Sequence, residues 1–195
     1  RRHTRLQGDW SSDVCSSDLA FLLFADAWVT HSVSAIFTGN TASYLEPCGC
    51  VEGMLGGISR RLEAMRDEKD FILFDSGNFI DISHELDETR NLFYARSFHQ
   101  MGYQAVGISS KEATRSTSFL KALSGSDLFV ATNLKSSSSD SYPFKKQVKV
   151  KGYTFISLLS PQTQVHENYE VVNPLKAIED YLNQSNLIQI GRAHV

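Results

Sequence analysis

Short apolar runs alternate along the chain with segments in which apolar residues recur every three or four positions. Runs of the first kind predict buried strands at 33–37, 71–74, 105–108, 128–132, 147–150 and 153–159. Segments of the second kind predict helices at 57–68, 88–101 and 117–123, with a last helix starting at Asn173-Pro174. This alternation of strand and helix predicts a layered α/β sheet within a single unit of about 160 residues.

The segments between these elements are interpreted as turns and loops. Lys151-Gly152 separates two apolar runs at the spacing of a tight hairpin turn. The four serines at 136–139 indicate a loop tip inside the unit, because paired strands continue after them. A long loop that contains glycine is expected between the first strand and the helix that starts at Gly57.

The two ends of the chain are interpreted apart from the rest. The codons for Asp9–Leu19 can spell a common sequencing-read adapter, and those for Ile190–Val195 its reverse-strand counterpart. We therefore expect residues 1–19 and 190–195 to be adapter-derived rather than native, and exclude them from inferences about the fold. Residues 28–189 are then expected to be the amino-terminal part of a longer domain, truncated at its carboxyl end.

Without these ends the net charge is about −4, which gives no electrostatic reason to expect nucleic acid or an anionic membrane surface as a partner. Residues 20–27 form an apolar run that closes on Ala25 and Ala27, the small-residue pattern of a signal-peptidase site. We expect a signal-peptide remnant and export, to the bacterial periplasm or cell envelope; an ordinary buried strand is the alternative. No other stretch has the length of apolar sequence that a membrane span needs.

Several short motifs follow one another in a set order: Phe-Thr-Gly-Asn-Thr-Ala at 37–42, Gly-Gly-Ile-Ser-Arg-Arg at 56–61, Phe-Asp-Ser-Gly-Asn-Phe at 74–79, Met-Gly-Tyr-Gln-Ala-Val at 101–106 and Ala-Thr-Asn-Leu at 131–134. In order and spacing the chain resembles the 5′-nucleotidase and UDP-sugar hydrolase branch of the calcineurin-like metallophosphoesterases. The resemblance covers nearly all of residues 28–189. It implies a layered α/β sandwich and, in the family, two divalent metal ions that bind a phosphoester and activate water.

The family's metal ligands are missing at the positions that precede residue 190. The resemblance places the first Asp and His ligands at Asn40 and Ala42, and the bridging carboxylate at Asn78. The family's Gly-Asn-His-Glu motif falls on Ser-Ser-Lys-Glu, with Ser110 and Lys111 at the ligand positions. Neutral amides and a lysine cation are poor ligands for a pair of divalent ions. We therefore expect a vestigial metal site and no divalent metal pair as a cofactor.

Cys48 and Cys50 flank Gly49 in the loop after the first strand, close to the emptied Asp position. Cysteines one residue apart can close a strained disulfide, which is easily reduced and therefore oxidising. The Cys-Gly-Cys motif also resembles a nucleotidase-like subfamily with selenocysteine-containing members, and that resemblance implies redox chemistry. Three interpretations remain open: thiol redox with Cys48 and Cys50 as the catalytic pair, a structural bridge, and binding of a soft metal or haem.

A glycine-rich segment leads into the first predicted helix. Gly56 and Gly57 precede Arg60 and Arg61, and free backbone amides together with guanidinium groups suit an anion. A tight turn beside solvated arginines is the simpler alternative.

The leading hypothesis is an exported nucleotidase-like domain that performs thiol redox with a partner redox protein. The alternatives are a non-catalytic module that binds a nucleotide or another small phosphorylated ligand, and a metal-dependent phosphoesterase with an unusual site.

Overall fold

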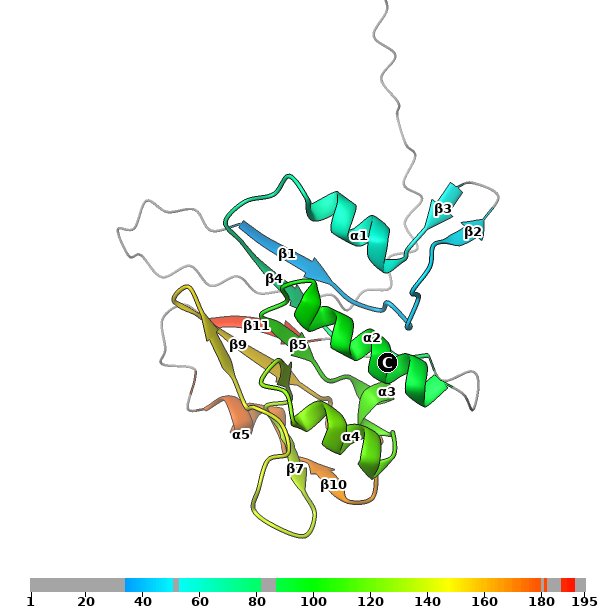
Figure 1. Cartoon of the computed structure of the whole chain (residues 1–195). Coiled ribbons are helices and arrows are strands. Elements are labelled where there is room, and N and C mark those ends of the chain that lie inside the picture. Colours follow the sequence, from blue (N-terminus) through cyan, green and yellow to red (C-terminus); the bar gives the residue numbers. More distant parts are fainter. Residues whose placement is uncertain (1–33, 51–52, 82–86, 180, 182–186, 192–195) are drawn as a thin grey trace, which may run out of the picture.

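The computed structural model of the 195-residue chain describes residues 34–50, 53–81, 87–179, 181 and 187–191 (Figure 1). The segment predicted as a signal-peptide remnant, 20–27, lies outside the described residues. Within the described ranges, no helix combines the length and apolar character that crossing a bilayer requires.

A four-stranded parallel sheet forms the centre of the molecule, in the order β1-β4-β5-β6. Its strands are β1 (Ser34–Thr38), β4 (Phe71–Asp75), β5 (Ala105–Gly107) and β6 (Phe129–Val130). Side chains alternate between its two faces, as the pleat of a strand requires. In β4, Leu73 joins the core beneath the helices, whereas Ile72 and Phe74 join a separate apolar cluster on the opposite face.

Helices cover one face of this sheet (Figure 1). They are α1 (Ile58–Met65), α2 (Asp87–Gln100) and α4 (Thr117–Ser124), with the single turn α3 (Ser110–Ala113) following β5. The core between helices and sheet contains a cluster of aromatic rings, in which Phe98 meets Phe79, Tyr94 and Tyr103 edge to face. These buried rings fix α2 against the sheet.

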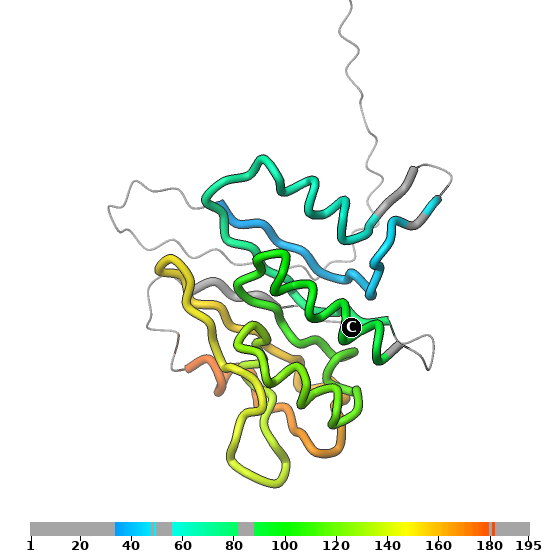
Figure 2. The backbone as a smooth tube through the Cα atoms, in the orientation of Figure 1, coloured from blue at the N-terminus to red at the C-terminus, as the bar shows by residue number. Residues whose placement is uncertain are grey.

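A second sheet packs on the opposite face, in the order β11-β9-β8. Figure 2 shows the backbone of its β8–β9 hairpin beside the parallel sheet. Its strands are β8 (Val148–Val150), β9 (Tyr153–Leu158) and β11 (Leu187–Gly191). The β8–β9 turn uses left-handed backbone at Lys151 (φ 48°) and Gly152 (φ 84°), as a two-residue hairpin requires. Phe155 of β9 packs on Phe74 of β4, and this contact joins the two sheets. The layers are therefore helix, parallel sheet and second sheet.

Three smaller features complete the described structure. The helix α5 (Pro174–Ile178) has the predicted proline in its first turn and Asn173 as its cap. An antiparallel pair joins β7 (Leu134–Ser136) to β10 (Tyr169–Val171). A separate hairpin pairs β2 (Cys48–Cys50) with β3 (Gly53–Leu55).

The α/β prediction and its principal elements are confirmed, with shorter bounds at several ends. The strand predicted at 128–132 ends at Val130, because the next two N–H groups turn to carbonyls of Lys145 and Ser157. The helix predicted from residue 57 begins at Ile58, since Gly57 has a φ of 86°. The β2–β3 hairpin, α3, β7 and β10 were missed because segments of three or four residues carry no periodic pattern. Strand β11 includes Ile190 and Gly191, and the adapter origin of residues 190–195 stays a prediction.

Candidate functional site

The loops that follow β1 and β4 meet at the carboxyl edge of the parallel sheet, where α/β folds commonly bind ligands. The backbone N–H of Asn40 donates to the carbonyl of Gly77 at 3.0 Å, and that of Ser43 donates to the carbonyl of Phe79 at 2.6 Å. Asn40 and Asn78 both have left-handed backbone, with φ of 57° and 58°. The two loops, which contain the first and second predicted ligand segments, thus run side by side.

Asn40 and Asn78 are joined through their side chains. The amide nitrogen Nδ2 of Asn78 donates a hydrogen bond to Oδ1 of Asn40. Asn78 is almost completely buried, and its own Oδ1 has no hydrogen-bond partner in the described structure. Ala42 is half-buried in the loop after β1, which also contains Asn40, and its N–H donates to the carbonyl of Asn78 at 3.4 Å. Three of the five predicted positions therefore lie together.

The third segment, at the end of β5, is organised by a buried carboxylate. Glu112 accepts backbone N–H bonds from Asn78 at 3.1 Å and from Phe79 at 2.8 Å, and caps α3 through Ser109. Ser110 and Lys111 lie half-buried in the first turn of that helix. Glu112 thus fastens the second and third segments to each other by hydrogen bonds that a neutral side chain cannot duplicate.

A second polar cluster lies beneath α1 and α2. Asp75, completely buried at the end of β4, accepts a hydrogen bond from the Thr38 hydroxyl at 2.6 Å and one from the Gly77 N–H at 2.8 Å. The same hydroxyl lies 2.7 Å from the phenol of Tyr103. Arg61 reaches inward from α1, donating to the Tyr94 phenol at 2.8 Å and to Tyr103 at 3.4 Å. We call these five side chains the Asp75 cluster: Thr38, Arg61, Asp75, Tyr94 and Tyr103.

Burial is the largest single influence on the pKa of each ionisable group in the Asp75 cluster. It raises the pKa of Asp75 to about 6, against the opposing hydrogen bonds from Thr38 and Gly77 and the charge of Arg61. Burial also raises the pKa of Tyr94 and of Tyr103, keeping both phenols neutral. Burial opposes the charge of Arg61, but the two tyrosines and Asp75 outweigh it, so the pKa of Arg61 is raised.

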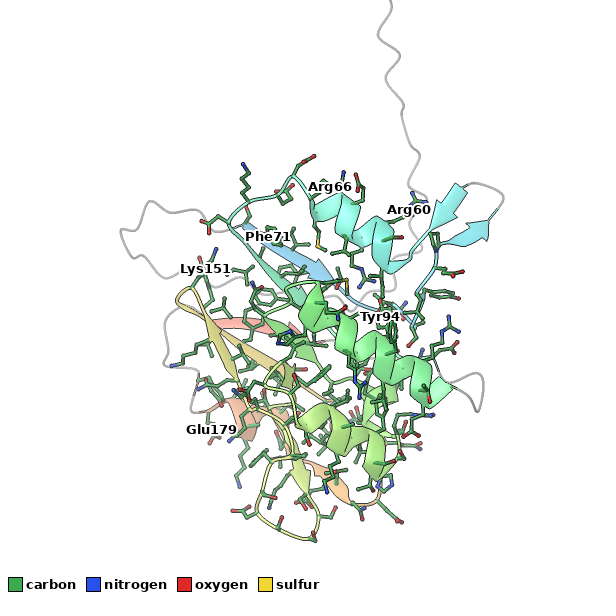
Figure 3. The ribbon with its side chains drawn as sticks, viewed as in Figure 1. Arg60, Arg66, Phe71, Tyr94, Lys151 and Glu179 are labelled. Atoms are coloured by element: carbon green, nitrogen blue, oxygen red, sulfur yellow. The ribbon has the colours of Figure 1, made fainter. Side chains whose placement is uncertain are left out.

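The predicted anion-binding residues surround the start of α1. Gly57 is buried against the chain at Pro47, so closely that a Cβ there would lie 2.8 Å from the Pro47 nitrogen. Gly56 and Arg60 are exposed, and Figure 3 shows Arg60 near the start of α1, with Tyr94 on the neighbouring α2. Arg61 is instead half-buried and bonded to the two phenols, so one arginine points inward and the other faces solvent.

Cys48, Gly49 and Cys50 form strand β2, opposite Leu55, Met54 and Gly53 of β3. This hairpin leads into the start of α1, outside the parallel sheet (Figure 1). Gly49 is exposed. The two cysteines therefore lie on a separate projection rather than at the junction of Asn40 and Asn78.

The Asp75 cluster was only partly indicated by sequence patterns. Asp75 and Arg61 lie within the family-like motifs, but neither was predicted to be buried with the other. Tyr94 lies within the helix predicted at 88–101, where nothing distinguishes it from an ordinary core tyrosine. Contact between residues so far apart along the chain depends on the packing of α1 and α2 over the sheet.

No protein-family model and no curated protein sequence matches the chain. Three solved structures share its fold: a 5′-nucleotidase precursor of Thermus thermophilus (18% identity, TM-score 0.69), the NAD nucleotidase of Haemophilus influenzae (17%, 0.63) and a calcineurin-like phosphoesterase of Bacillus subtilis (13%, 0.62). They match 82%, 83% and 84% of this chain, which spans 37%, 34% and 62% of theirs. The chain therefore has the α/β fold of 5′-nucleotidases and calcineurin-like phosphoesterases, over part of their length.

Proposed function

We propose that the chain is the amino-terminal part of an exported, nucleotidase-like domain whose Cys48–Cys50 pair exchanges between dithiol and disulfide. Its metal positions are vestigial in this proposal. The phosphoesterase-like fold supports the nucleotidase-like part, and the chemistry of the residues at the strand ends supports the rest.

The residues at the family's metal positions do not suit two divalent ions. The Asn78 amide is engaged with Asn40, so the groups that stand where two carboxylates are needed are neutral and bonded to each other. Lys111 adds a positive charge in the single turn α3, which follows β5. Divalent ions need anionic oxygen or imidazole ligands to offset their desolvation. No step of the proposed chemistry uses a metal ion.

The observation that carries the redox proposal is the extended backbone of Cys48-Gly49-Cys50 in β2. Alternate residues of an extended strand have Cα atoms about 6.4–6.8 Å apart. Disulfides most often join Cα atoms about 5.5–6 Å apart, so the strand geometry is at the long limit. Closing a Cys48–Cys50 bond at the usual Cα separation therefore requires β2 to shorten, which weakens its pairing with β3. A disulfide that costs backbone pairing is strained, and a strained disulfide is readily reduced.

The exchange is a two-electron step. The attacking thiolate of one partner opens the disulfide of the other through a mixed disulfide, and two protons and two electrons leave the dithiol as it is oxidised. An oxidised Cys48–Cys50 pair would thus form a disulfide in a partner dithiol protein and itself become a dithiol. Gly49, exposed between the cysteines, leaves the approach of such a partner unobstructed by a side chain.

The experiment is a redox titration of the full chain carrying Cys15→Ser, so that Cys48 and Cys50 are the remaining thiols. The chain is equilibrated in glutathione or thioredoxin buffers, alkylated and weighed by mass spectrometry. We expect a two-electron transition with a midpoint above about −230 mV, within the range of oxidising thiol proteins. A pair that stays reduced at every poise, or that is reduced only after unfolding, would contradict the proposal. Cys48→Ser is the control and should show no internal disulfide.

A phosphoesterase assay distinguishes the redox proposal from its main alternative, a metal-dependent phosphoesterase. Hydrolysis of a nucleoside monophosphate that depends on added Mn²⁺ or Zn²⁺ would establish metal catalysis and overturn the vestigial-site part of the proposal. We expect no metal-dependent turnover by the chain.

The second candidate is non-catalytic binding of a nucleotide or phosphate at the start of α1. It is favoured by Arg60, which remains exposed beside Gly56 while Arg61 is engaged with the tyrosines. Binding of a nucleoside monophosphate that is weakened by Arg60→Gln but unchanged by Cys48→Ser would support this candidate.

A further inference from the structure

A polar hollow of about 420 Å³ lies at the opposite edge of the sheet from the candidate site. Gln104 immediately precedes β5 and Asp127 lies two residues before β6, so the hollow opens at the amino ends of these strands. Asn40 and Asn78 instead follow the carboxyl ends of β1 and β4. The hollow is therefore separate from both the strand-end amides and the cysteine hairpin.

Its lining carries an excess of positive charge. Lys145 is neutralised by Asp127, with Nζ 2.9 Å from a carboxylate oxygen. Lys149 lines the same hollow from β8, is exposed, and makes no ion pair in the part of the chain that is described. His99, in the last turn of α2, adds an imidazole to the lining. One uncompensated ammonium beside an imidazole attracts an anion.

Two amide side chains add neutral hydrogen-bonding groups to the lining. The side-chain oxygen of Gln104 accepts the Leu73 N–H at 2.6 Å, which leaves its amino group as a donor. The side-chain oxygen of Gln147 is buried and has no hydrogen-bond partner in the described structure. A buried acceptor without a partner costs free energy, so a hydrogen bond that it accepts from a ligand hydroxyl would be favourable.

We propose that this hollow binds a small organic anion that carries a hydroxyl group next to its charged head. Lys149 and His99 hold the phosphate or carboxylate, the Gln104 amide donates to it, and Gln147 accepts from the hydroxyl. The volume falls at the small end of the range of about 300–1,000 Å³ for ligand pockets. The polar lining selects a hydrophilic ligand over an apolar one.

The test is isothermal titration calorimetry of the full chain with three separate titrants: glycerol 3-phosphate, glycerate and the neutral compound glycerol. The variant is Lys149→Gln, and the matched control is Lys146→Gln, a lysine of the same segment that packs on the Tyr142 ring instead. We expect one site per chain for at least one of the anions and none for glycerol. Lys149→Gln should weaken that site by about fivefold or more, the loss of one charge-assisted hydrogen bond, and Lys146→Gln by less than about twofold.

Binding of one anion and not the other supports the proposal and identifies the charged head as phosphate or carboxylate. Absence of binding by both anions overturns it. Equal weakening by Lys149→Gln and Lys146→Gln also overturns it, because the interaction is then a diffuse surface attraction. The Cys48→Ser chain should bind unchanged, so this result is independent of the redox proposal.

Discussion

The buried carboxyl of Asp75 makes the stability of the fold dependent on pH. Its pKa is about 6 in the folded chain and 3.8 for the unperturbed group. The folded state therefore binds the proton of the Asp75 carboxyl group more tightly than the unfolded state does. Stability from this group is fully present below about pH 3.8 and is lost as the pH rises through about 6.

The size of the effect follows from the difference between the two pKa values. About two pKa units correspond to about 3 kcal/mol of unfolding free energy in total, of which about 2–2.5 kcal/mol is lost between pH 4 and pH 7. Asp75→Asn removes the titration and keeps the shape of the side chain. Its amide oxygen can still accept the Gly77 N–H, while its amino group requires the Thr38 hydroxyl to turn and accept.

Urea unfolding from pH 4 to pH 7.5, monitored by circular dichroism, measures this effect. The unfolding free energy of the parent chain minus that of Asp75→Asn should fall by about 2–2.5 kcal/mol across this interval, with its midpoint near pH 5. Asp67→Asn, at an exposed position, is the control and should leave a flat difference. A flat difference for Asp75→Asn as well, or one that rises with pH, would refute the assigned burial of the ionised carboxyl.

Two further substitutions test the packing around α1, again by urea unfolding. Gly57→Ala should cost about 2–4 kcal/mol of unfolding free energy, because φ is 86° and the new Cβ lies 2.8 Å from the Pro47 backbone. The control is Gly102→Ala, which has a φ of 81° in open space and should cost only about 1–2 kcal/mol. Equal losses for the two variants would contradict the close approach of Gly57 to Pro47. Arg61→Met should cost about 1–3 kcal/mol through its lost bond to a buried phenol, whereas exposed Arg60→Met should change stability by less than about 0.5 kcal/mol. An Arg61→Met chain as stable as Arg60→Met would show that the inward arginine contributes nothing.

The candidate site was predictable in its position and only partly in its contacts. The motifs at 37–42 and 74–79 placed Asn40 and Asn78 at the ends of two strands that proved to be neighbours. That their amides bond to each other depends on left-handed backbone at both residues, which no sequence pattern specified. Glu112 appeared in sequence as the last residue of a degenerate motif, yet it holds two loops through their N–H groups. Those bonds exist because α3 and the loop after β4 converge in space.

The sequence by itself determined the order and type of the main elements, since buried strands and amphipathic helices leave periodic apolar patterns within a few residues. Those patterns act locally, and the motifs between them also predicted that neutral residues stand at positions where the family that the chain resembles has metal ligands. The tertiary structure alone decided that Arg61 turns inward while Arg60 faces solvent, and that Asp75 is deprived of water. The physical reason is that burial of a charge is a property of all the elements packed around it. Apart from the nearby Gly77 N–H, the groups that act on Asp75 come from β1, α1 and α3, which are adjacent only after folding.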